Sequence, residues 1–201
     1  MAIEKRKQYS SYDEYKSHQS EKTTRIVKEK SRREYLSRKK KLSDRLKTLV
    51  DGNFISKGQK VLCLGARTGE EVEVFREFGT DAIGVDLVPC PPLVVEGDFH
   101  NLPFESKSFD VLYTNCFDHV FDVDKFIESM MKVLKDGGII VLDVYLKDAL
   151  FKSLEVMYVD SSEDIENKFC KDFKFTLIHK DENAPKLYRK KHICIQYIFR
   201  K

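Results

Sequence analysis

The 201-residue sequence lacks several features that would place it in particular classes of protein. It has no run of about 18 apolar residues, so we expect no membrane-spanning helix. Its first residues are polar and charged and lack the apolar stretch of a secretory signal. Its five cysteines are scattered and include no CxxC pair, so we expect neither a disulfide framework nor a zinc site. These absences predict a cytoplasmic protein, with a nuclear one as the alternative, that has no metal and no membrane partner.

Charges of both signs are present but unevenly distributed. Residues 1–60 carry 18 Lys and Arg against 8 Asp and Glu, whereas residues 61–178 carry 11 against 23. Residues 179–201 are basic again, with 7 against 2. A basic arm beside an acidic body can hold a phosphate-rich partner such as nucleic acid. It can equally be a solvated helix that keeps the protein soluble, and the sequence leaves both readings open.

Hydrophobic residues make up 41% of the chain, and no internal repeat or Pro/Ser-rich linker divides it, so we expect one domain with an N-terminal extension. Residues 1–19 show no clear period and predict a loose tail. Residues 20–56 predict a basic helical arm. The apolar residues Leu42, Leu46, Leu49 and Val50 follow helical spacing, and the turn that follows them stops the helix. Residues 57–201 are expected to form the domain itself.

Strands and helices alternate along the middle of the chain. Short apolar strands are expected at 61–64, 82–87, 93–96, 109–115 and 139–145, with helices at 70–78 and 124–134. This alternation predicts a parallel sheet with helices on its faces. A helix near 162–172 is followed by strands at 173–179 and 192–200 with no helix between them, which predicts an antiparallel hairpin at the end of the sheet.

Three of the expected strands end in residues that suit a nucleotide-like ligand. The first strand runs into Gly65 and Gly69, where the backbone can turn sharply and present N–H groups at a helix start. The second ends at Asp86, whose carboxylate can accept hydrogen bonds from both hydroxyls of a ribose. The third runs into Asp98, which can accept from an exocyclic amine, and Phe99 can pack on the ring. Such residues meet at one edge of a parallel sheet.

In this order and spacing the residues resemble the class I S-adenosylmethionine-dependent methyltransferases. The resemblance covers about Val61 to Tyr145, including the Phe109–Asn115 strand and the Leu134–Gly138 turn, and more loosely the closing hairpin. It implies an α/β fold: a Rossmann-like three-layer sandwich with a mostly parallel seven-stranded sheet and an antiparallel C-terminal hairpin strand. It also implies S-adenosyl-L-methionine as cofactor and S-adenosyl-L-homocysteine as product. The implied cofactor contacts are Gly65, Ala66, Arg67, Gly69, Asp86, Leu87, Asp98, Phe99 and Asn115.

Two positions depart from the pattern of that family. Cys63 stands where the family has an acid, and Arg67 stands where it has a glycine. The missing acid weakens the expected grip on the ammonium group of the cofactor. Arg67 can instead face the methionine carboxylate, or it can point into solvent. A site for NAD is the natural competitor, but the GxGxxG fingerprint is absent.

Methyl transfer from a sulfonium needs a base only if the acceptor must lose a proton. The resemblance places the segment after the fourth strand beside the cofactor, so His119 and Asp118 are the candidate catalytic residues. His119 can also be a purely structural residue. His100 is expected at the surface, and Cys116 is expected to pack near the pocket.

The acceptor is not identified by any motif. A small molecule is favoured, and RNA or a protein held by the basic arm is the alternative. A third reading is a protein that binds the cofactor or a partner without catalysis. The helical arm is expected to act as a lid, lined by Tyr12, Tyr15 and Tyr35, on a monomer or weak dimer.

Overall fold

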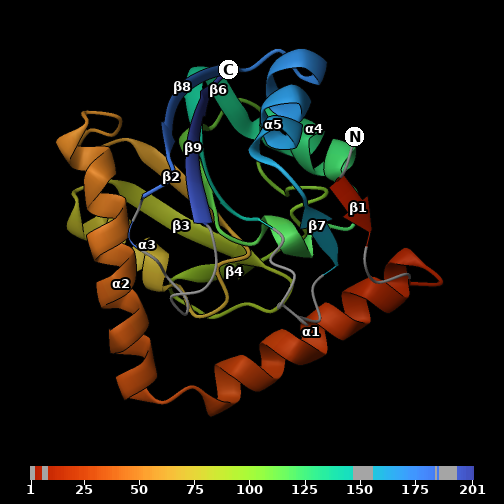
Figure 1. The fold of residues 1–201 in the computed structure, drawn as a ribbon. Coiled ribbons are helices and arrows are strands. Elements are labelled where there is room, and N and C mark those ends of the chain that lie inside the picture. Colours follow the sequence, from red (N-terminus) through yellow and green to blue (C-terminus); the bar gives the residue numbers. More distant parts are fainter. Residues whose placement is uncertain (1–2, 6–8, 147–155, 184, 186–193) are drawn as a thin grey trace.

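The computed structural model of the chain describes residues 3–5, 9–146, 156–183, 185 and 194–201. A seven-stranded sheet with the order β4-β3-β2-β5-β6-β9-β8 lies at its centre (Figure 1). Its strands are β2 (Lys60–Leu64), β3 (Asp81–Asp86), β4 (Val94–Glu96), β5 (Phe109–Thr114), β6 (Leu134–Tyr145), β8 (Thr176–Asp181) and β9 (Cys194–Arg200). Strands β2 to β6 pair in parallel, whereas β9 is antiparallel to both β6 and β8. The predicted fold class is therefore confirmed.

Helices cover both faces of the sheet and enclose two apolar cores. On one face lie α2 (Arg32–Asp51) and α3 (Glu70–Glu77), and on the other lie α4 (Val123–Val133), α5 (Ser162–Glu166) and a π-helical turn (Asn167–Asp172). Successive side chains of β2 point alternately into the two cores. Val61 and Cys63 face the first, whereas Leu62 and Leu64 face the second. No helix in the described parts of the chain is long and apolar enough to cross a membrane.

The prediction of a loose N-terminal tail is wrong for residues 12–19. They belong to α1 (Tyr12–Glu29), which begins after Ser11, whose hydroxyl accepts a hydrogen bond from the backbone N–H of Glu14. The short strand β1 (Ile3–Lys5) also pairs antiparallel with β7 (Met157–Val159). The remaining tail residues 1–2 and 6–8 lie outside the described residues. The weak apolar period of this segment hid the helix, because its buried face is largely tyrosine and polar.

The basic arm is two helices instead of one. The break falls at Lys30 and Ser31, between α1 and α2. Ser31 and Glu34 form a capping box, in which the serine hydroxyl accepts from the Glu34 N–H and the glutamate accepts from the Ser31 N–H. This local signature lies inside a run of good helix formers, so the composition of the run concealed it. The break turns α1 away from α2 and carries it along the sheet edge (Figure 1).

The turn expected before the fifth strand also differs. Helix α4 ends at Val133, and β6 starts at Leu134, so Gly137 and Gly138 lie within the strand. Gly137 has a φ of 74°, which suits glycine, and the pairing of β5 with β6 shifts register between Phe109 and Val111. The strand therefore begins with an irregular segment that the glycines permit.

Candidate functional site

The loop after β2 has the left-handed backbone that its glycines predict. Gly65 and Gly69 have φ values of 68° and 81°, and Arg67 adopts 45°, a region that non-glycine residues seldom enter. A Cβ added at Gly65 would lie 2.5 Å from the Sγ atom of Cys116. Cys116 is buried, as expected of a packing residue near the pocket. The loop therefore approaches the end of β5 too closely for any side chain at position 65.

Asp86 and Asp98 follow neighbouring strands, as the sequence predicts. Asp86 is buried, and its carboxylate accepts hydrogen bonds from the backbone N–H groups of Arg67 (3.0 Å) and Val88 (3.3 Å). Burial raises the pKa of Asp86 and outweighs these bonds. At Asp98, burial is outweighed by hydrogen bonds from His100 and Tyr12, which lower its pKa to about 2. Both acids are therefore held in place by hydrogen bonds within the chain.

Helix α1 covers this edge of the sheet and is tied to it at both ends. The Tyr12 hydroxyl donates to the Oδ2 atom of Asp98 at 2.6 Å, and the Tyr15 hydroxyl donates to the carbonyl of His119 at 3.1 Å. At the other end, the Lys30 ammonium pairs with Glu70 and donates to the Thr68 hydroxyl at 2.8 Å. The helix therefore spans from the end of β4 to the start of α3.

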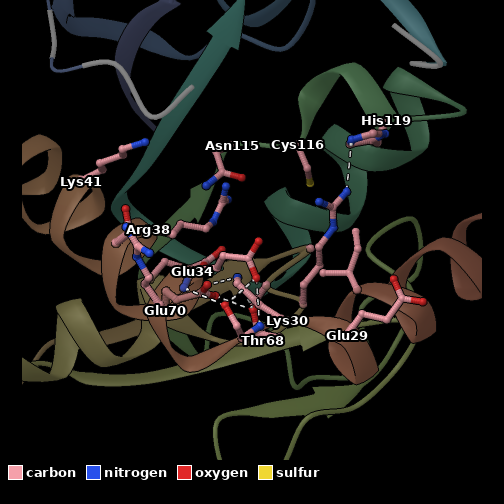
Figure 2. Close-up of a pocket in the computed structure, with 18 residues that line it drawn as sticks. Glu29, Lys30, Glu34, Arg38, Lys41, Thr68, Glu70, Asn115, Cys116 and His119 are labelled. Atoms are coloured by element: carbon pink, nitrogen blue, oxygen red, sulfur yellow. Dashed lines mark hydrogen bonds and ion pairs between the residues drawn. The ribbon is translucent and has the colours of Figure 1, made fainter. Parts of the chain in front are cut away.

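Two cavities lie under this helix and beside α2. The larger has a volume of about 970 Å³ and lies between α2, the end of α1 and the glycine loop. Figure 2 shows Arg38 and Lys41 of α2 on one side of it and His119 on the other. The smaller, of about 30 Å³, lies between α1 and Asp86, Leu87 and Phe99. Gly65, Arg67, Cys116 and His119 line both.

The structure therefore divides the candidate residues into groups. Ala66 and Asn115 line the large cavity, whereas Asp86, Leu87 and Phe99 line the small one. Asp98 and Gly69 line neither; Asp98 is covered by Tyr12, and Gly69 begins α3. The side chains expected around an adenosine are thus brought together, but α1 leaves little room between them.

The two candidate catalytic residues are placed differently. His119 lies where the two cavities meet, and its Nε2 atom is 3.4 Å from the Nη2 atom of Arg67. Arg67 therefore points toward His119 and not into open solvent. Asp118 is half-buried, lines neither cavity, and its carbonyl accepts from the Val156 N–H at 3.0 Å. The geometry favours His119 over Asp118 as a group that meets a ligand.

The prediction that His100 lies at the surface is wrong. Its ring is buried, and its Nε2 atom accepts from the backbone N–H groups of Phe121 and Asp122, each at 3.2 Å. A neutral ring then carries its proton on Nδ1, which lies 3.2 Å from Asp98 and 2.8 Å from the Tyr12 oxygen. His100 therefore connects Asp98 to the loop after β5. Its position two residues after Asp98 was the signal that could have found it.

The structure also adds residues that the sequence did not single out for the site. Lys30, Arg38 and Glu71 line the large cavity. Tyr35 lies on α2 within the predicted arm, but it lines neither cavity, and its hydroxyl bonds to Glu73. Among the described residues, no group of three or more His, Cys, Asp or Glu side chains is arranged to hold a metal ion.

Part of the chain matches a known family model. Residues 62–142, which run from β2 to β6, match the family model described as "Methyltransferase domain". Over these residues the chain is similar to a methyltransferase domain. The order of the strands agrees with the class I, S-adenosylmethionine-dependent type that the sequence resembles.

Curated proteins similar to this chain include a demethylmenaquinone methyltransferase from Paenarthrobacter aurescens (strain TC1). It is 32% identical over 105 residues, which cover 47% of this chain and 42% of the relative. A norajmaline N-methyltransferase from Rauvolfia serpentina is 29% identical over 132 residues, covering 57% and 45%. The chain thus spans less than half the length of these two relatives.

Solved structures share the fold at low identity. The 1,6-didemethyltoxoflavin-N1-methyltransferase of Burkholderia thailandensis, solved with S-adenosylhomocysteine, has a TM-score of 0.68 and 15% identity, and the match covers 99% of this chain and 94% of that one. The [4+2]-cyclase SpnF has a TM-score of 0.62 and 15% identity, covering 79% and 80%. Since one of these neighbours is named as a cyclase, the likeness of fold does not settle the reaction.

Proposed function

We propose that this chain is an S-adenosylmethionine-dependent methyltransferase that methylates a small molecule and leaves S-adenosylhomocysteine. The observation that carries the proposal is the meeting of Asp86 and Asp98 with the left-handed loop at Gly65 on one edge of the sheet. Strand order reverses on either side of β2 at this edge, which is where open α/β sheets bind ligands.

The residues at this edge fit the chemical groups of the cofactor. A sulfonium methyl group is already activated, so the protein mainly positions the acceptor against it. Gly65 and Ala66 line the large cavity, where their backbone can contact the cofactor. Asp86 accepts from ribose hydroxyls, and Asp98 accepts from the adenine amine. His119, at the meeting of the cavities, takes a proton from an acceptor that must lose one.

The small cavity is too small for an adenosine, so α1 has to shift when the cofactor binds. About 30 Å³ lies between α1 and Asp86, whereas sites for small ligands have about 300–1,000 Å³. The contacts that have to change are those of Tyr12 with Asp98 and of Tyr15 with the His119 carbonyl. In this proposal α1 is a lid that closes over bound cofactor and keeps water from the reacting groups.

A small molecule is the acceptor class that the arm and the cavity favour. The large cavity, of about 970 Å³, has room for a small molecule beside the methionine part of the cofactor. Several basic residues of α2 are already paired within the chain. Lys39 contacts Glu73 and Glu77, Lys40 contacts Asp44, and Lys47 contacts Asp51. This pairing leaves less charge for a nucleic-acid backbone.

Titration calorimetry tests the proposed function directly. S-adenosylmethionine and S-adenosylhomocysteine should each bind with a dissociation constant between about 1 µM and 1 mM, the usual range of KM values. NAD should give no heat, because the sequence lacks the GxGxxG fingerprint of dinucleotide-binding sites. If neither sulfur compound binds at millimolar concentration, or if NAD binds instead, the proposal is wrong.

Replacing Tyr12 with phenylalanine tests the lid. The variant lacks the hydroxyl that occupies Asp98, so no hydrogen bond is broken when the cofactor arrives. We expect S-adenosylhomocysteine to bind about 3- to 10-fold more tightly, as the loss of one net hydrogen bond of about 1 kcal/mol implies. Tyr35→Phe is the matched control, because its hydroxyl bonds to Glu73 away from the strand ends. Weaker binding in Tyr12→Phe would instead show that Tyr12 belongs to the bound site.

A further inference from the structure

Glu71 is a buried carboxylate whose hydrogen bonding is incomplete. It lies in the first turn of α3, is 3% exposed, and lines the large cavity beside Ala66 and Asn115. Among the described residues its Oε2 atom has no hydrogen-bond partner. A buried acceptor without a partner costs about 1–3 kcal/mol, and more when it is charged, so such a group needs an explanation.

The neighbouring glutamate is already engaged. The carboxylate of Glu70 pairs with Lys30 and accepts from the Thr68 hydroxyl. These contacts tie the lid helix to the start of α3. Of the two acids that begin α3 and line the cavity, Glu71 is therefore the one that has an oxygen to offer a ligand.

The charge of Glu71 lies near the position from which the family's acid is missing. Cys63 is fully buried; burial raises the pKa of its thiol, and the charge of Glu71 raises it further. Tyr113, which is opposite Cys63 in the β2–β5 register, is affected in the same way. Glu71 lines the large cavity together with Gly65 and Ala66, which directly follow β2. The two effects on pKa, which weaken with distance, agree with this position.

We propose that Glu71 supplies from α3 the carboxylate that Cys63 does not supply from β2, and that it binds the α-ammonium group of the cofactor's methionine part. This inference rests on the proposed function and adds a binding residue to that site. An ammonium group would donate to the open oxygen of Glu71 as a charge-assisted hydrogen bond. Arg38, the neighbouring cation with the largest effect on Glu71, lines the same cavity and brings a positive charge to the side where the methionine carboxylate would lie.

Glu71 should destabilise the folded chain when no ligand is bound. Burial raises the pKa of Glu71, and this outweighs the opposing effects of Arg38, its own backbone N–H, Lys30 and Arg67. A carboxyl group with a raised pKa in the folded state makes folding less favourable as pH rises above its unfolded value. At neutral pH, Glu71→Gln should therefore melt at the same temperature or higher. A residue that only supported the fold would show the opposite.

The test compares ligands with and without the amino-acid part. Glu71→Gln should bind S-adenosylhomocysteine about 10- to 100-fold more weakly than the unmodified chain, as loss of a charged hydrogen bond implies. It should bind 5′-methylthioadenosine, which has no ammonium group, with unchanged affinity. The double variant Cys63→Asp/Glu71→Gln should regain most of the lost affinity, because the carboxylate returns from β2. Glu73→Gln is the control, since Glu73 pairs with Lys39 outside the cavity.

The outcomes separate this inference from the proposed function. If the unmodified chain binds neither ligand, the proposed function fails and this inference fails with it. If it binds both, and Glu71→Gln binds S-adenosylhomocysteine equally well, only this inference is overturned. An equal loss for both ligands, or a large fall in melting temperature, would show that Glu71 supports the fold and would also overturn it.

Discussion

Replacing Arg45 with leucine should lower the free energy of unfolding by about 3–5 kcal/mol, the usual cost of leaving a buried charge without its partner. Arg45 and Asp143 are both 0% exposed. The guanidinium donates to both carboxylate oxygens, from Nε at 2.7 Å and from Nη2 at 2.8 Å. Leucine would leave the carboxylate of Asp143 buried in the core with no cation beside it. Urea denaturation followed by circular dichroism measures the change.

Further hydrogen bonds fix the position of the Asp143 carboxylate. Its carboxylate also accepts from the Tyr113 hydroxyl at 2.8 Å and from the Gln196 amide at 3.0 Å. Tyr113 in turn accepts from the amide of Asn115, which lines the large cavity. The buried pair on α2 and β6 therefore reaches the candidate site through two hydrogen bonds. We therefore expect the loss of Arg45 to make the position of the Asn115 side chain less well fixed, in addition to destabilising the core.

Two further variants make this prediction testable. Lys47→Ala removes a cation two residues along the same helix, where its pair with Asp51 is more than half exposed, and should change stability by about 0.5 kcal/mol or less. Arg45→Leu/Asp143→Asn removes both charges and should be at least about 1 kcal/mol more stable than Arg45→Leu alone. If the two changes in the double variant simply add, the two residues are not coupled and the prediction is wrong.

The sheet could be predicted because each of its strands and turns is determined by residues that lie close together in the sequence. Each of β2, β3 and β5 is a short apolar run that ends in a glycine or a polar residue, and the positions of Asp86 and Asp98 follow from the ends of β3 and β4. The closing hairpin was also predictable, since no helix separates its strands. These features depend on residues close together in the sequence, so the pattern contains the information.

The features that were missed depend on contacts across the fold. Arg45 shares the buried face of α2 with Leu42, Leu46 and Leu49, but its charge hid this, because its partner Asp143 lies 98 residues away. Asp143, the one acid within the apolar run 139–145 of β6, was the available signal. Helix α1 was likewise hidden, since it is stabilised by the contacts of Tyr12 and Tyr15 with distant loops and has little apolar period.

Asp86→Ala should weaken binding of S-adenosylhomocysteine by about 100-fold or more, because two hydrogen bonds from ribose hydroxyls to a charged group contribute about 1.5–3 kcal/mol each. The fold should survive the change. Burial raises the pKa of Asp86 above its usual range, so its charge does not stabilise the folded chain at neutral pH. Titration calorimetry with matched melting curves measures both effects.

Asp86→Asn separates the charge from the local geometry. The asparagine oxygen can still accept from the Arg67 N–H, so the glycine loop should keep its shape while the charge is lost. We expect an intermediate loss of about 10-fold, since a neutral acceptor makes the weaker hydrogen bond. Asp81→Ala, at the exposed first residue of the same strand, should leave the affinity unchanged. Equal affinities for all three variants and the unmodified chain would mean that the ribose lies elsewhere, because Asp86 is the only carboxylate among the described residues that line the small cavity.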